Sequence, residues 1–169
     1  MSNQFSKDDF KEIVIKYGDF LFRTCFIMVN NKYDAEDIVQ ETLIKYYLEN
    51  RIFNDEEHKK AWLLKVSQNM CRDLLRYNNR HLHVTYDEVS DSLISNDKYK
   101  YETIEDYLKI ANLDYKYKSV IVLFYMEGYS IDEISRILDI SQSAVKMRLK
   151  RGKEKLKDVL SEYLNKEVL

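Results

Sequence analysis

A run of positively charged side chains near the C-terminal end is the first feature of the sequence that could do chemistry. Between Val145 and Lys157 only one acidic residue, Glu154, interrupts the lysines and arginines. A helix carrying such residues fits the major groove of DNA, where lysine and arginine donate to guanine or phosphate and methionine can contact a thymine methyl. The candidate DNA-binding residues here are Ser141, Ser143, Lys146, Met147, Arg148, Lys150 and Arg151.

The residues just before this run predict a helix-turn-helix. Ser130 and Glu133 have the spacing of a capping box, which starts a helix. Asp139 stands in the turn, where aspartate tolerates a left-handed backbone better than most residues, and Ser141 can cap the next helix. Capping, turn spacing and charge together favour DNA binding over a merely solvated basic helix. Many regulators carry such a unit, so by itself it leaves a dimeric repressor or activator open.

A second group of polar side chains lies in the first half, in an acid-rich segment. Acidic residues along a helix edge are suited to docking on basic residues of a large partner. Stabilisation by the helix dipole explains why acidic residues stand in the first turn, at Asp34 and Glu36. It does not explain Gln40 and Glu41, which lie further along the helix. The candidate partner-binding residues are Asp34, Glu36, Asp37, Gln40 and Glu41.

A third group forms a polar face on a later helix of the first half. Such a face could hold phosphates and bind an unstacked base by its hydrogen-bonding edge. Trp62 shares the apolar phase of Val66, so we expect it in the core rather than stacked on a base. The candidate residues are Lys65, Gln68, Asn69, Arg72, Asp73 and Arg76.

The elements that position these residues are all predicted to be helices. The 169 residues contain no proline and only three glycines, so the usual punctuation of sheets is missing. Apolar residues at three- and four-residue spacing predict helices over about residues 7–30, 34–50 and 60–78, and spacing resumes near Ile104. Residues 81–100 lack this period. The prediction is an all-α chain of two small helical domains joined by a flexible linker, the second a four-helix domain with the helix-turn-helix.

Composition excludes several classes of function. The net charge of −2 argues against a stand-alone, non-specific nucleic-acid binder. Two cysteines within apolar stretches favour a reducing compartment, and no apolar run approaches the roughly 20 residues of a membrane helix, so we expect a cytoplasmic protein. The sequence shows no paired nucleophile and base, no glycine-rich phosphate loop and no metal cluster. We therefore expect no enzyme activity, no cofactor and no metal.

Three segments resemble one family. Residues 34–42, Asp-Ala-Glu-Asp-Ile-Val-Gln-Glu-Thr, are similar to the polymerase-clamp-binding segment of sigma factors. Residues 61–69 with Arg72, Asp73 and Arg76 resemble the promoter-melting helix of the extracytoplasmic-function (ECF) group, and residues 128–134 with 145–149 resemble its upstream-element reader. The chain departs from the family pattern in lacking a proline in 113–116, in having Ser143-Ala144 where Gly-Thr is usual, and in having Lys150 where an aromatic residue is common.

The resemblance implies a role for each part of the chain. Residues 1–80 would be sigma region 2, which binds the polymerase clamp and recognises and melts the downstream promoter element, with Phe53 in a loop that helps form the base pocket. Residues 81–100 would be the linker, and residues 101–169 region 4, which is held by the polymerase flap and binds the upstream element. The implied partners are core RNA polymerase, promoter DNA and a dedicated anti-sigma factor, in this family often membrane-bound. A dimeric helix-turn-helix regulator and a purely protein-binding helical adaptor remain the alternatives.

Overall fold

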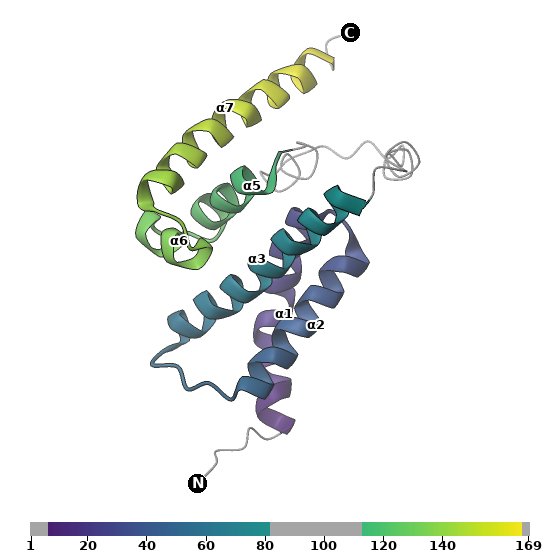
Figure 1. Ribbon diagram of the computed structural model, residues 1–169, viewed down its shortest axis with the longest axis vertical. Helices are drawn as coiled ribbons and strands as arrows, with labels where there is room; N and C mark the ends of the chain where they lie inside the picture. The colour runs from purple at the N-terminus through teal and green to yellow at the C-terminus, as the bar shows by residue number, and fades with distance from the viewer. Residues whose placement is uncertain (1–6, 82–112, 167–169) are drawn as a thin grey trace.

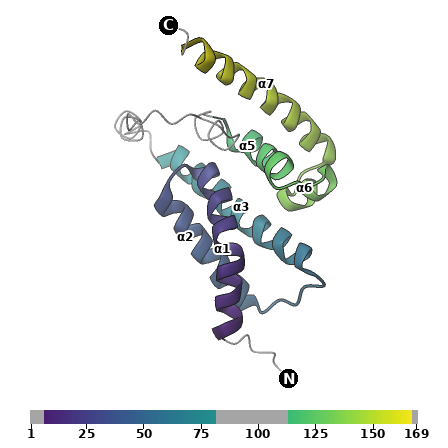
Figure 2. The same ribbon diagram turned by 180° about the vertical axis from the view of Figure 1, so that it is seen from behind.

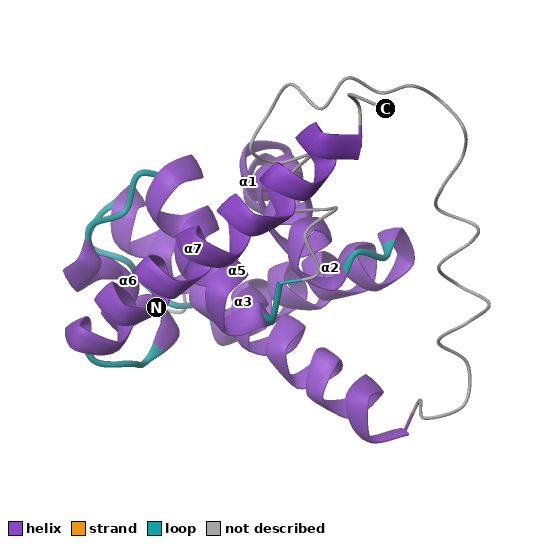
Figure 3. Cartoon of the chain, turned by 90° about the horizontal axis from the view of Figure 1, so that it is seen from above, coloured by secondary structure: helices purple, strands orange, loops and turns teal. Residues whose placement is uncertain are grey.

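The computed structural model describes residues 7–81 and 113–166, and in these two stretches the chain consists of helices and loops without a strand (Figure 3). The all-α prediction is thereby confirmed. The predicted linker lies outside the described residues except for His81, which is the last residue of a helix, and so does the helix expected near Ile104.

The first half is a bundle of three long helices, α1 (Lys7–Val29), α2 (Lys32–Glu49) and α3 (Glu56–His81), each packed against the other two. Seen from behind, α1 lies over α2 and α3 (Figure 2). Leu21 and Ile27 of α1 and Leu63 and Leu64 of α3 are fully buried at its centre. No helix in the described parts of the chain is long and apolar enough to cross a membrane.

Polar side chains cap these helices and determine where they begin and end. The starts of α2 and α3 differ from the predicted ones. The side chain of Asn31 accepts the backbone N–H of Asp34 at 3.1 Å, so Asn31 caps α2 and the helix begins two residues before the predicted start at 34. The side chain of Asp55 accepts the backbone N–H of His58 at 2.8 Å, and α3 therefore begins earlier than its apolar spacing indicates. Asn50 ends α2 in the left-handed conformation, with φ 46°.

The second half contains α5 (Tyr115–Ile121), a π-helical turn η1 (Val122–Met126), α6 (Ile131–Leu138) and α7 (Gln142–Lys166). Gly128 follows η1 with φ 72°, and the next residue, Tyr129, donates its N–H to the Leu123 carbonyl at 2.9 Å. A left-handed glycine commonly ends a helix in this way, and the hydrogen bond here spans one residue more than usual because the preceding turn is π-helical. Both α5 and α6 pack on α7.

The two halves are packed together in a closed arrangement. Figure 1 shows α5 and α6 lying between α7 and the first three helices, with α6 against α3 and α5 against α1. Buried apolar residues of both halves belong to one continuous cluster. Polar contacts cross between the halves at three places: Tyr115 Oη to Gln68 O at 3.1 Å and to Gln68 Oε1 at 3.3 Å, Lys118 Nζ to Ile27 O at 3.3 Å, and Arg23 Nη2 to Glu127 Oε1 at 2.9 Å.

Candidate functional site

The acidic residues selected from the sequence lie together on the outer face of α2. Asp37, Gln40 and Glu41 are exposed, and their side chains form no hydrogen bond or ion pair with any residue that the structure describes. Glu36 lies 3.8 Å from Lys32, and Asp34 is half-buried in the first turn. The middle of this face therefore offers unpaired carboxylates and an amide to a partner.

Three apolar residues outside the predicted partner-binding set share this face. Tyr33 is 75%, Ile44 51% and Leu48 73% exposed. They fall at three- and four-residue spacing from Asp37 and Glu41, hence on the same side of the helix. Their phase is opposite to that of the buried residues of α2, and this was the signal in the sequence that could have identified them.

The third group of candidates forms one face of α3. Lys65, Asn69, Arg72 and Arg76 follow a four- and three-residue spacing, with Asp73 beside them. Lys65, Asp73 and Arg76 are exposed, while Asn69 and Arg72 are half-buried. Arg72 Nε lies 3.4 Å from Asp73 Oδ1, a long ion pair that leaves the guanidinium available for phosphate. This face therefore carries three positively charged side chains, those of Lys65, Arg72 and Arg76.

Gln68, predicted on the same face, is buried beneath the second half. The Tyr115 hydroxyl contacts both its backbone carbonyl, at 3.1 Å, and its side-chain Oε1, at 3.3 Å. Its Nε2 has no hydrogen-bond partner within the described residues. In this closed arrangement Gln68 offers no surface to DNA. Tyr115 follows it by 47 residues, which is why spacing along α3 could not indicate the contact.

The loop between α2 and α3 places Phe53 inward rather than toward solvent. Its ring stacks on Tyr46 at 5.8 Å between centroids and lies 5.9 Å from that of Trp62. Trp62 is thus part of the packing, as its apolar phase predicts. Phe53 packs inward and supports the loop. Its two neighbours in the loop, Ile52 and Asn54, are both exposed.

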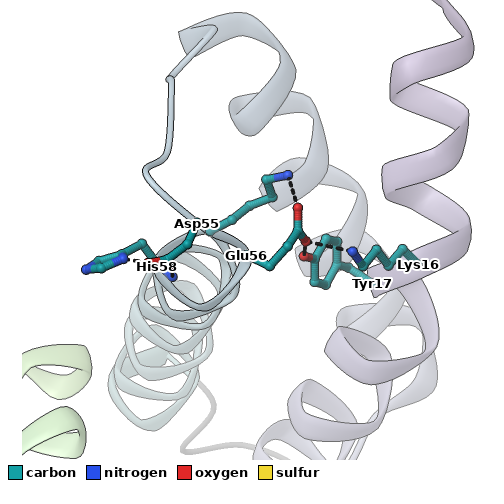
Figure 4. A network of polar contacts seen from close by, with 6 residues as sticks. Lys16, Tyr17, Asp55, Glu56 and His58 are labelled. Atoms are coloured by element: carbon teal, nitrogen blue, oxygen red, sulfur yellow. Dashed lines mark hydrogen bonds and ion pairs between the residues drawn. The ribbon is translucent and has the colours of Figure 1, made fainter.

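A network of polar contacts ties the end of this loop to α1 (Figure 4). Glu56 accepts Lys16 and Lys59, each at 2.7 Å, and the hydroxyl of Tyr17. The hydrogen bonds from Lys16, Lys59 and Tyr17 lower the pKa of Glu56 to about 2. Burial, together with the Glu56 carboxylate, raises the pKa of Tyr17 above its ordinary value. Glu56 is ionised at neutral pH, and three side chains fix the position of the loop.

The helix-turn-helix forms as the sequence predicts. The Ser130 side chain accepts the N–H of Glu133 at 3.2 Å, and Glu133 accepts the N–H of Ser130 at 2.8 Å. Asp139 is left-handed, with φ 55°, and Ser141 Oγ accepts the N–H of Ala144 at 3.1 Å. These local contacts fix the turn between α6 and α7, and the turn sets the direction in which α7 leaves α6.

The outer face of α7 carries the predicted positive charge. Val145, Leu149 and Leu156 are buried against α5 and α6, which turns the basic residues outward. Arg148 is half-buried. The exposed members of the predicted set are Ser141, Ser143, Lys146, Met147, Lys150 and Arg151.

Tyr115 of the second half lies against a candidate residue of the first half, Gln68. Burial raises the pKa of the Tyr115 phenol, and the positive charges of Arg72 on α3 and Arg148 on α7 oppose that rise. The Tyr115 hydroxyl contacts Gln68, so in the closed arrangement the second half adjoins the candidate face of α3.

Two family models match the chain, one in each half. Residues 13–81 match the family described as Sigma-70 region 2, and residues 107–156 match the one described as Sigma-70, region 4. Together with the helical fold, these matches define a sigma factor of RNA polymerase.

Comparison with curated relatives shows to which group of sigma factors the chain belongs. The chain is 30% identical over 168 residues to the ECF RNA polymerase sigma factor SigW of Bacillus subtilis, covering 91% of this chain and 90% of SigW. It is 26% identical over 163 residues to the ECF RNA polymerase sigma factor SigM of the same bacterium, covering 92% of this chain and 98% of SigM. The chain belongs to the ECF RNA polymerase sigma factors. Members of this family are transcription initiation factors that give core polymerase its promoter choice.

Solved structures share the fold. The sigma factor RpoE from Bartonella quintana, in a co-crystal with the anti-sigma factor NepR, matches with a TM-score of 0.68 at 23% identity, covering 91% of this chain and 98% of RpoE. CnrH, in complex with the cytosolic domain of CnrY, matches with a TM-score of 0.66 at 23% identity, covering 93% of this chain and 90% of CnrH.

Proposed function

We propose that three surfaces of this sigma factor have separate roles in initiation, one in binding core polymerase and two in binding promoter DNA. The outer face of α2 docks on the polymerase clamp through Asp37, Gln40 and Glu41. The α3 face and the loop before it, within residues 1–80, capture and melt the downstream element near minus ten. The basic face of α7, within residues 101–169, binds the upstream element near minus thirty-five. The observation that carries the proposal is the set of unpaired acidic side chains on α2, placed away from the basic face of α7.

The closed arrangement must open for both elements to be bound at once. Elements 25 base pairs apart are separated by about 85 Å along B-DNA, at about 3.4 Å per base pair. In the closed arrangement the second half instead packs directly on α3 and α1, with the Tyr115 hydroxyl on Gln68. A 20-residue linker reaches about 70 Å when fully extended, and the two halves add their own width. We propose that residues 81–100 allow this separation, and that one rigid polymerase then holds both weak DNA contacts at high effective concentration.

The contact between the halves has features that lower the cost of opening. Lys118 is buried, and this burial lowers its pKa from the ordinary 10.5. Gln68 Nε2 and the Tyr129 hydroxyl are buried with no hydrogen-bond partner within the described residues. Each buried, unpaired polar group costs about 1–3 kcal/mol relative to hydration. Opening lets water reach all three groups, and this offsets part of the apolar contact that is lost.

We propose an anti-sigma factor as the partner that controls this step in the cytoplasm. RpoE and CnrH, which share the fold, were each solved in complex with a second protein, and in the first case that protein is named as an anti-sigma factor. A partner that binds the closed arrangement would keep the two halves packed together, so that they could not reach two separate promoter elements.

Reversing one charge tests clamp docking. Asp37→Lys should raise the Kd for core polymerase at least tenfold, because an unpaired carboxylate on the docking face becomes a repelling ammonium. Asp19→Lys makes the same change at an exposed site on α1 and serves as the control. Circular dichroism checks that both variants fold. Equal core affinity for Asp37→Lys and wild type would remove α2 from the polymerase interface.

Arg151 tests the upstream assignment. Arg151→Ala should cost on the order of 1–3 kcal/mol on the preferred upstream element if the guanidinium contacts a base. Lys157→Ala, further along the same helix, is the control for a general loss of positive charge. An equal loss on every promoter sequence would reduce Arg151 to a phosphate contact. No loss on any sequence would remove it from the DNA surface.

A further inference from the structure

We infer that Gln142, the first residue of α7, recognises one base of the upstream element, with adenine as the preferred base, and that Asp132 of α6 is the positioning residue that orients its amide. The inference rests on the proposed upstream-element contact of α7 and adds to that site a specificity-determining residue and its support.

The contact that carries this inference joins the two helices of the helix-turn-helix. Gln142 Nε2 donates to Asp132 Oδ1 at 3.0 Å. The other carboxylate oxygen of Asp132 accepts Nη2 of Arg136, four residues further along α6. The side chains of Asp132 and Arg136 are 55% and 68% exposed, and Gln142 is exposed as well. All three side chains are therefore open to a ligand at the point where α7 begins.

The chemistry of the partner fixes the orientation of the Gln142 amide. A carboxylate only accepts hydrogen bonds, so Gln142 must turn its NH2 group, rather than its carbonyl oxygen, toward Asp132. Its Oε1 forms no hydrogen bond with any residue that the structure describes, and one N–H is sufficient for the contact with Asp132. The amide thus keeps one acceptor and one donor for a ligand. It cannot exchange them by a flip of the side chain without losing the hydrogen bond to Asp132.

The remaining donor and acceptor select the base. In the major groove, adenine presents N7 as an acceptor beside its N6 amine as a donor, and a glutamine amide can bind both. Guanine presents two acceptors, N7 and O6, and would leave Gln142 Oε1 without a donor. Thymine and cytosine each offer only one of the two hydrogen bonds. Adenine is therefore the base that complements Gln142.

The place of Gln142 on α7 supports a contact with a base. In a helix-turn-helix, the N-terminal residues of the second helix contact base edges, while the first helix crosses the DNA backbone. Gln142 stands between Ser141 and Ser143, which are both exposed and both predicted to bind DNA. Arg136 neutralises the Asp132 carboxylate, which would otherwise repel phosphate at this surface. Asp132 can therefore orient Gln142 without opposing the approach of DNA.

The test uses holoenzyme assembled from the full-length protein and core polymerase, on a promoter with a randomised upstream element whose bound fragments are sequenced. The wild type should favour adenine at one position that depends on Gln142. Gln142→Ala should lower this preference roughly 5- to 100-fold and leave the preferences at other positions unchanged. Asp132→Ala should lower the same preference by a smaller factor, roughly 2- to 10-fold, because the free amide must then be ordered on binding.

A matched control and a folding check accompany these variants. Glu154→Ala, at an exposed site further along α7, should keep every base preference of the wild type. Thermal unfolding checks that each variant is folded. A purely structural contact between α6 and α7 makes a different prediction, because its loss would weaken binding equally on all upstream sequences.

The outcomes separate this inference from the function on which it rests. An equal loss on all sequences in Gln142→Ala, or wild-type preferences in that variant, would overturn the base contact. A Gln142-dependent preference for another base would overturn the choice of adenine, and wild-type preferences in Asp132→Ala would overturn its positioning role. Absence of any base preference in the upstream element for the wild type would instead overturn the proposed upstream-element contact of α7.

Discussion

Gly152 lies where the recognition helix α7 crosses α5, and its replacement by alanine should destabilise the protein. A Cβ atom at Gly152 would lie 2.8 Å from Ile121 Cδ1 and 3.3 Å from Tyr117 Cβ. Ile121 is fully buried and has little room to turn, while Tyr117 Cβ is fixed to the backbone of α5. The added methyl group must therefore push α7 away from α5.

Two opposing effects set the size of the change. Alanine is favoured over glycine by about 1 kcal/mol in a helix interior. Overpacking a filled core by one methyl group costs about 1–3 kcal/mol. We expect Gly152→Ala to lower the free energy of unfolding by about 1 kcal/mol. Gly18 in α1 has no atom within 4 Å of an added Cβ, so Gly18→Ala should gain about 1 kcal/mol from helix propensity alone.

Urea unfolding of the two variants beside the wild type measures this difference. Because α7 carries the basic face, Gly152→Ala should also weaken upstream-element binding while the affinity for core polymerase stays unchanged. Equal stabilisation by both alanines would refute the reasoning, since it would mean that α7 and α5 are not in close contact at Gly152.

Three further substitutions have expected outcomes. Asp139→Gly should raise the free energy of unfolding by about 0.5–1 kcal/mol in urea, because glycine adopts φ 55° without strain. Lys118→Met should raise stability at pH 7 by ~1 kcal/mol. Burial lowers the Lys118 pKa, so wild-type stability should rise toward pH 10.5 and approach that of the variant in thermal scans; parallel pH profiles would contradict this. Glu56→Gln should cost about 0.5–1 kcal/mol at pH 7. The wild type should lose the same amount as pH falls from 4.5 toward 2, and a loss confined to higher pH would contradict the Glu56 network.

Local signals in the sequence predicted the helix-turn-helix closely. Ser130 with Glu133, and Ser141 with Ala144, are contacts between residues three apart, and they form as their spacing indicates. The same holds for the alternation of buried Val145 and Leu149 with exposed Lys146 and Lys150. Periodicity also gave the three helices of the first half, with errors at the ends where Asn31 and Asp55 supply caps.

Contacts between distant residues were beyond the reach of the sequence. Gln68 and Phe53 have the residue types of a promoter-binding site, yet Tyr115 covers one and Tyr46 and Trp62 pack against the other. Nothing in the local pattern distinguishes a polar residue on an open helix face from one under a second domain. Ile44 and Leu48 are the reverse case, because their phase on α2 indicates exposure but their type suggested burial.

Promoter-specific initiation in a reconstituted reaction tests the central claim most directly. Core polymerase, with and without this protein, is given a pool of bacterial promoter fragments, and the transcripts are mapped to their start sites. We predict a limited set of start sites that depends on the protein and is lost with Asp37→Lys. Tight binding of the protein to duplex DNA without polymerase, together with no new start site on any fragment, would contradict the sigma-factor function.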